Sequence, residues 1–135
     1  LIYNAASQTN EQESATLAYD WLENRNVSYA EEVERMIELS ADYITAQLTN
    51  ETEKIFHDLD LAILGSPKVT YQEYATNIRK EYKHMSDEEF NAGRASFITK
   101  IIEKETIFQT EAFHDMFEET ARENMRDELE QLTQK

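Results

Sequence analysis

Two arginines are the side chains of this sequence with the clearest capacity for chemistry. Arg79 lies in the segment IRKEY at residues 78–82, and Arg94 directly follows Gly93. A guanidinium fork matches the geometry of a phosphate group, so both arginines are candidate phosphate contacts. The alternative is an internal ion pair, Arg79 with Glu81 or Arg94 with another glutamate, that would join helices to each other.

A second group of polar residues is the segment HDLD at residues 57–60. Residues i and i+2 of a helix point about 200° apart, so Asp58 and Asp60 are not expected to share a face unless the helix begins between them. The pair His57-Asp58 could touch a metal ion, with a surface or capping role as the alternative. Two further histidines lie among charged residues and are expected to be solvated: His84 and His114.

Composition limits the classes of protein that this chain can belong to. The chain has 135 residues, with 13 Lys+Arg against 28 Asp+Glu and a formal net charge of −15. That length fits one domain over residues 1–135, which would bury roughly two-thirds of its unfolded surface. Such acidity repels phosphate backbones, so a nucleic-acid polymer is not an expected partner. The absence of cysteine excludes disulfides, thiolate zinc sites and cysteine nucleophiles.

The sequence also carries signals about location. No apolar run approaches about 18 residues, so no membrane-spanning helix is expected. The chain opens on Leu1-Ile2-Tyr3, without a methionine or the charged start of a signal peptide, which suggests that other residues preceded Leu1. Without an export signal or cysteine, a cytoplasmic location is the default expectation.

Apolar residues recur every three or four positions, which predicts helices almost throughout. Two Gly and one Pro are too few for the turns of an all-β sandwich or barrel. We therefore expect an all-α fold, a bundle of five or six helices joined by short loops. The expected helices cover about residues 10–24, 28–48, 51–64, 70–82, 86–101 and 110–132.

Several residues predict where these helices begin and end. Three capping boxes are expected, at Ser28 with Glu31, Thr70 with Glu73, and Ser86 with Glu89. Gly65 followed by Pro67 is a stop signal for the third helix. Gly93 lies in the middle of a helix, where close packing against another helix, or a ligand, would justify it. Four aromatic residues are expected in the core: Tyr74, Tyr82, Phe97 and Phe113.

The order of short motifs in this chain resembles one family. These motifs are NEQESA at residues 10–15, DLDLAILG at 58–65, IRKEY at 78–82 and AGR at 92–94, and the last helix also fits the pattern. Together they resemble the predicted metal-dependent phosphohydrolases of the HD superfamily, named for a His-Asp metal-binding pair. The resemblance covers nearly the whole chain, and DLAILG and IRKEY are its most specific parts.

The resemblance implies an HD-domain-like helical bundle that holds one or two divalent metal ions. The family's ligands are an upstream His, the His-Asp pair and a later Asp, and Asp60 matches that last Asp. Such ligands can hold Mn, Fe, Mg or Zn, which acidifies a bound water for attack on phosphorus. Asp60 is thus the expected metal ligand and catalytic residue, with Arg79 and Arg94 as expected substrate contacts.

The chain departs from the family pattern in its histidines. The upstream His and the His-Asp pair are expected immediately before Leu1, so the domain is expected to be truncated at its N-terminus. His57-Asp58 does not match the namesake pair, because it aligns two residues before Asp60. A further His is expected shortly after Thr45, where this chain has Gln47 and Leu48.

Two functions follow as expectations. The first is a metal-dependent phosphohydrolase acting on a small phosphorylated metabolite or nucleotide, with this truncated form inactive and its metal lost. The second is a non-catalytic acidic helical module for protein interaction or oligomerisation, because missing helices would leave an apolar groove that recruits partners. Such a groove also predicts that the isolated chain forms a homo-oligomer.

Overall fold

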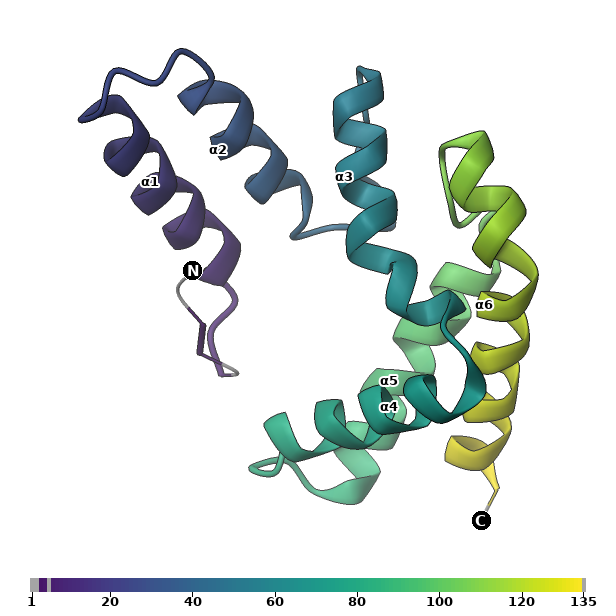
Figure 1. Ribbon diagram of the computed structural model, residues 1–135. Coiled ribbons are helices and arrows are strands. Elements are labelled where there is room, and N and C mark those ends of the chain that lie inside the picture. Colours follow the sequence, from purple (N-terminus) through teal and green to yellow (C-terminus); the bar gives the residue numbers. More distant parts are fainter. Residues whose placement is uncertain (1–2, 5, 135) are drawn as a thin grey trace. The chain divides into compact units, whose positions relative to one another are not determined.

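The computed structural model describes residues 3–4 and 6–134 (Figure 1). These residues form six α-helices and one 3-10 helix, and no strand occurs among them. The all-α fold class is therefore confirmed. Leu1 and Ile2, on which the expectation of a preceding segment rests, lie outside the described residues. No helix in the described part of the chain is long and apolar enough to cross a membrane.

The chain divides into two compact units, residues 1–56 and 57–135. The prediction of a single domain over residues 1–135 stays a prediction. In the first unit, α1 (Asn10–Glu23) packs against α2 (Ala30–Leu39), and Figure 1 shows the two helices side by side. Ala15 and Ala30 are buried. The first turns of α3 (Glu51–Leu61) complete this unit.

The second helix is shorter than its hydrophobic pattern predicts. It ends at Leu39 rather than near Leu48. Beyond this point side chains bind the backbone, since the Ser40 hydroxyl donates to the Ile37 carbonyl and Asp42 accepts from the Ile44 and Thr45 amides. Such local bonds compete with helical ones and favour turns. The turn therefore overrides a periodicity that continues past it.

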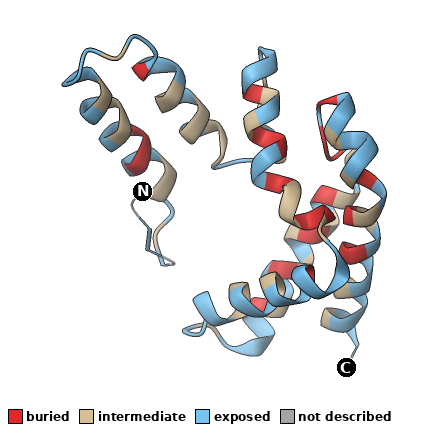
Figure 2. Cartoon of the chain, in the orientation of Figure 1, coloured by how far each residue is buried: buried red, intermediate tan, exposed pale blue. Residues whose placement is uncertain are grey.

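The second unit packs its last helix against the rest. It contains the end of α3, the 3-10 helix η1 (Ala62–Gly65), α4 (Lys68–Glu81), α5 (Asp87–Ile102) and α6 (Glu111–Thr133). Helix α6 contacts both η1 and α5, and α4 contacts η1. Buried positions gather where η1 meets α6 (Figure 2). The apolar core is Leu61, Leu64, Tyr71, Phe90, Ile98, Ile101, Ile107, Phe108, Ala121 and Met125.

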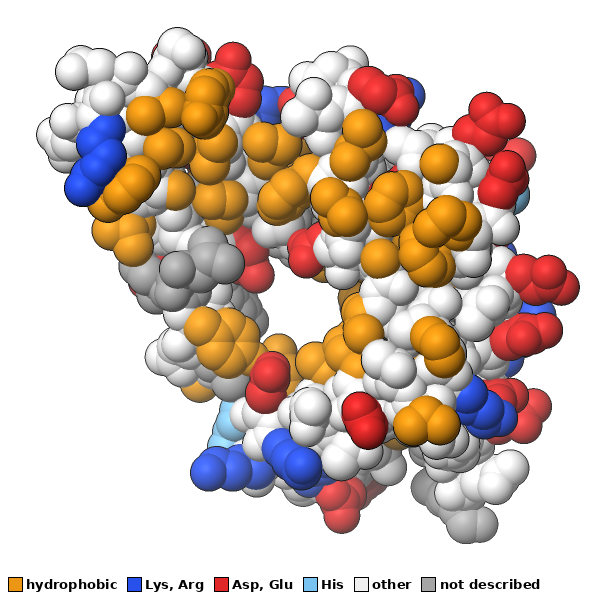
Figure 3. Space-filling model, viewed as in Figure 1, with side chains coloured by type: hydrophobic (Ala, Val, Ile, Leu, Met, Phe, Trp, Pro, Cys, Tyr) orange, Lys and Arg blue, Asp and Glu red, His pale blue; other side chains and the backbone are white. Residues whose placement is uncertain are grey.

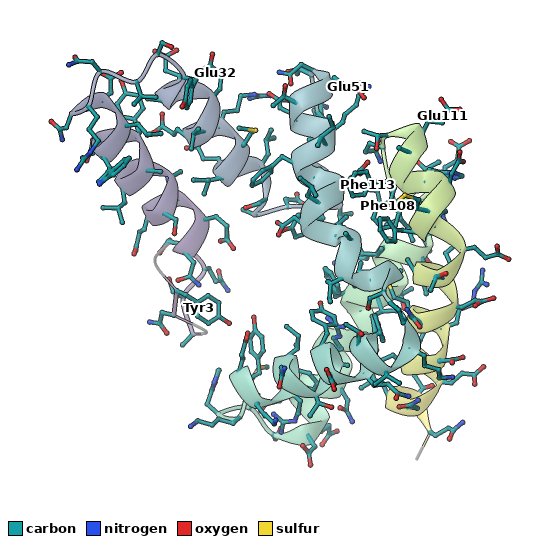
Figure 4. All side chains as sticks on the ribbon, in the orientation of Figure 1. Tyr3, Glu32, Glu51, Phe108, Glu111 and Phe113 are labelled. Carbon is teal, nitrogen blue, oxygen red and sulfur yellow. The ribbon has the colours of Figure 1, made fainter. Side chains whose placement is uncertain are left out.

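Aromatic packing supports the start of α6. Phe108, in the loop before the helix, has its ring centroid 5.8 Å from that of Phe117 and 6.4 Å from that of Phe113, and Figure 4 labels Phe108 and Phe113. Phe113 is half-buried, as are the other aromatic residues predicted for the core, Tyr74, Tyr82 and Phe97. The prediction of core positions is therefore met in part, because these side chains line the edge of the core.

Only one of the three predicted capping boxes forms. At α5 the Ser86 hydroxyl accepts from the Glu89 amide at 3.2 Å, and the Ser86 amide donates to the Glu89 carboxylate at 3.0 Å. The boxes at Ser28 and Thr70 are wrong, because α2 begins at Ala30 and α4 at Lys68 without a side-chain cap. Pro67 precedes α4, and its fixed φ and missing amide proton suit a helix start.

The two glycines have opposite surroundings. A Cβ added at Gly65 would lie 2.6 Å from the Phe117 Cβ and 2.9 Å from the Phe117 carbonyl oxygen, so η1 touches α6 at this point. A Cβ added at Gly93 would meet nothing within 4 Å. The expectation that close packing explains Gly93 is therefore wrong. The close approach occurs at the glycine that was expected only to stop a helix.

These glycines give a matched pair of stability predictions. Gly65→Ala should lower the free energy of unfolding by about 1–3 kcal/mol, because the backbone of α6 has to move away from the new methyl group. Gly93→Ala should raise it by about 0.5–1 kcal/mol, because alanine favours a helix interior and space is available. Urea unfolding of both variants tests this, and equal effects would contradict the assigned packing.

Candidate functional site

Asp58 is a fully buried carboxylate that caps another helix. Its Oδ1 accepts from the Gln109 amide at 2.8 Å, and its Oδ2 accepts from the Thr110 amide and hydroxyl, each at 2.7 Å. His57 Nδ1 lies 3.1 Å from Oδ1. Thr110 is the N-cap of α6, so Asp58 places a negative charge at the positive end of that helix. Of the roles considered from the sequence, the capping role is confirmed, while a surface position is wrong because His57 and Asp58 are both buried.

Asp60 lies two residues further along α3 and is exposed. Because Asp58 is buried and Asp60 exposed on the same helix, the prediction that they do not share a face is confirmed. Asp60 is thus the one of the two aspartates in this segment whose side chain is exposed. Within residues 3–4 and 6–134, however, no group of three or more His, Cys, Asp or Glu side chains is placed to hold a metal ion.

Arg94 is nearly buried and pairs with Glu128 across α5 and α6. Its Nε lies 2.8 Å from Glu128 Oε1 and its Nη2 3.0 Å from Oε2, a bidentate ion pair. Its guanidinium also lies over the Tyr74 ring, 5.3 Å from the ring centroid. Tyr71 donates to the same carboxylate, and burial together with this hydrogen bond raises the pKa of its hydroxyl, which therefore stays protonated. The alternative of an internal Arg94–glutamate pair is confirmed.

Arg79 is held at the turn between α4 and α5. It does not pair with Glu81, as one alternative had it, but with Asp87, at 2.6 Å from Nη2. Its Nη1 donates to the Tyr82 carbonyl and its Nη2 to the Met85 carbonyl. The guanidinium therefore satisfies carbonyls that a helix end leaves without partners. A phosphate contact by Arg79 or Arg94 stays a prediction, and both are engaged within the protein.

Two residues to which the sequence assigned no role hold the loop before α6. The Glu118 carboxylate accepts from the Ile107 amide at 2.9 Å and from the Phe108 amide at 3.0 Å. Arg122 bonds to Glu118 and donates to the carbonyls of Ile102 and Lys104. Their i, i+4 spacing was the available signal. Asn124 has a similar role, since its amide donates to the carbonyls of Leu64 and Ser66.

The buried polar groups of the second unit are therefore structural. The carboxylates of Asp58, Glu118 and Glu128 each accept several donors, and none of the buried side-chain nitrogen or oxygen atoms in the described part of the chain lacks a partner. His84 and His114 are exposed, as predicted. Acidic side chains follow the outer side of α6 (Figure 3). Of the three predicted site residues, Asp60 alone is exposed.

Comparison with known proteins adds no relative. No protein-family model, no curated protein and no solved structure matches this chain.

The capping role of Asp58 predicts a large effect of a small change. Asp58→Asn should lower the free energy of unfolding by about 2–3 kcal/mol, because the neutral amide turns a donor toward backbone N–H groups and loses charged hydrogen bonds. Asp60→Asn, on the exposed side of the same helix, should change it by less than about 0.5 kcal/mol. Urea denaturation measures both effects. An Asp58→Asn variant as stable as the unchanged protein would contradict the capping role of Asp58.

The ion pair of Arg94 predicts that lysine does not replace it. Arg94→Lys keeps the charge but loses the two-pronged bond to Glu128, which should lower the free energy of unfolding by about 1.5–3 kcal/mol. Arg126→Lys, an exposed change on α6, is the control and should be nearly neutral. An Arg94→Lys protein as stable as the control would argue against the structural role.

Proposed function

We propose that this chain is part of a metal-dependent phosphohydrolase of the HD superfamily, acting on a small phosphorylated metabolite or nucleotide. The proposal rests on the ordered motifs of the sequence. One structural observation supports it. In the segment DLDLAILG, Asp58 is buried and caps α6, whereas the side chain of Asp60 is exposed at the surface. A cap that fixes the end of α3 would give a neighbouring ligand a fixed direction.

The described residues do not by themselves fit a metal ion. Asp60 is one carboxylate, and an ion of the Mn, Fe, Mg or Zn type needs several protein ligands. No such group occurs in the ranges that the structure describes. In the proposed protein the imidazole ligands would come from polypeptide beyond these 135 residues.

The arginines take a different part in this proposal. Arg94 is committed to Glu128, and Arg79 to Asp87 and two carbonyls. Their first contribution is then to hold α4, α5 and α6 in place. To bind a phosphate, either guanidinium would have to exchange a protein partner for the substrate. The free energy of the broken ion pair would then reduce the affinity for the phosphate.

The test uses the gene product that contains the residues encoded ahead of Leu1. We expect it to carry a His-Asp pair there, to bind a divalent metal and to hydrolyse phosphate esters. Asp60→Asn should reduce metal-dependent turnover by at least about 100-fold, because a lost ligand weakens the ion. Asp115→Asn, an exposed change on α6, should leave turnover unaltered. Absence of the His-Asp pair, or full activity of Asp60→Asn, would contradict the proposal.

A second candidate is a non-catalytic helical module that binds another protein or a second copy of itself. It is compatible with the use of Asp58 and Arg94, two residues of the family motifs, for helix capping and helix pairing. Partner binding in this case would not depend on Asp60. A variant Asp60→Asn that keeps partner binding and affects no turnover would separate this candidate from the enzyme.

A further inference from the structure

The first unit contains a pocket of about 340 Å³ beside the start of α3. Its lining combines side chains of α2, of the segment before α3 and of the first turn of α3, among them Arg35, Met36, Asn50, Thr52 and Glu53. Its size falls at the lower end of the range for small-molecule sites. All of these residues belong to one compact unit.

The acceptors in this pocket are already occupied. Glu53, whose side chain is 4% exposed, accepts from Arg35 Nε at 2.6 Å and from the Thr49 amide and hydroxyl at 2.7 and 3.0 Å. The hydrogen bond from Arg35, followed by that from the Thr49 amide, lowers the pKa of the Glu53 carboxyl. The carboxylate thus stays charged and fixes the guanidinium by one edge.

Several hydrogen-bond donors that line the pocket have no partner in the described chain. Glu53 is the only hydrogen-bond partner of Arg35 within residues 3–4 and 6–134, and the Arg35 side chain is 48% exposed, so the four N–H groups on its Nη1 and Nη2 are open to solvent or to a ligand. Asn50 accepts the Glu53 amide proton through Oδ1 at 2.9 Å, which leaves its Nδ2 without a partner in the described chain. The Thr52 hydroxyl has none there either.

We propose that this pocket binds an oxyanion, specifically the phosphate group of a small molecule, through Arg35, Asn50 and Thr52. A guanidinium held at Nε presents its remaining fork to a phosphate in the geometry that favours bidentate binding. Met36 supplies an apolar wall for an organic portion of the ligand. The site lies away from Asp60, Arg79 and Arg94 in the sequence and does not depend on the proposed hydrolase activity.

Glu32 sets the strength of the site. It is an exposed residue of the first turn of α2, labelled in Figure 4, and it also lines the pocket. Its carboxylate repels an anion, as does the net charge of −15. We therefore expect a dissociation constant for inorganic phosphate of about 1 mM, measured at about 0.15 M ionic strength to screen the distant charges.

The experiment titrates the 135-residue chain with inorganic phosphate and follows the backbone amides of residues 49–53 by NMR. Arg35→Lys should weaken binding at least about tenfold, because lysine can keep the ion pair with Glu53 but has no second edge. Asn50→Asp keeps the oxygen that caps α3 and replaces a donor by a negative charge, so it should also weaken binding about tenfold. Glu32→Gln should tighten it about threefold.

A control variant tests whether the effect is specific to the pocket. Arg25→Gln, which removes an exposed arginine of the same unit, should leave phosphate binding unchanged. Unfolding curves establish that Asn50→Asp is folded. Absence of saturation by about 50 mM phosphate, equal binding of acetate, or normal binding by Asn50→Asp would overturn the proposal. Because the assay involves neither metal nor turnover, its failure would leave the hydrolase proposal untouched.

Discussion

The second unit depends on one buried carboxylate. Asp58 lies at the end of α3, and its two oxygens bind the backbone just before α6, 51 and 52 residues further along the chain. Removing a charge from water is expensive, and only several well-placed donors offset that cost. Asp58 has three of them within 2.8 Å, besides the imidazole of His57. The direction of α6 relative to the end of α3 is therefore fixed by hydrogen bonds as well as by apolar packing.

The same solution recurs around this core. Glu118 with Arg122, and Glu128 with Arg94, pair charges that are largely withdrawn from solvent. The two carboxylates also accept from a backbone amide and from a tyrosine hydroxyl, respectively. Such pairs add little net stability when intact and cost much when one member is lost. Residues that attract attention as chemistry in the sequence thus act first as connectors between helices. Surface position, rather than residue type, separates Asp60 from them.

The sequence predicted the helices better than their ends or their connections. Repeats of three and four residues, together with capping and stop signals, located all six helices, because burial of one helix face requires that spacing. The pattern failed at Leu39, where Ser40 and Asp42 bind the backbone. Two capping boxes also failed, since the motif needs a backbone geometry that the residue types do not guarantee. Pairs such as Arg94 with Glu128, 34 residues apart, were out of reach because only the tertiary fold brings them together.

The loop between α5 and α6 illustrates what these connectors imply for the evolution of the chain. Surface loops normally tolerate changes of length. Here the backbone amides of Ile107 and Phe108 donate to the Glu118 carboxylate, and those of Gln109 and Thr110 donate to the Asp58 carboxylate. Adding or deleting one residue would shift at least one amide pair away from its carboxylate. This segment should therefore keep a constant length among any relatives and be a poor place to splice in a tag.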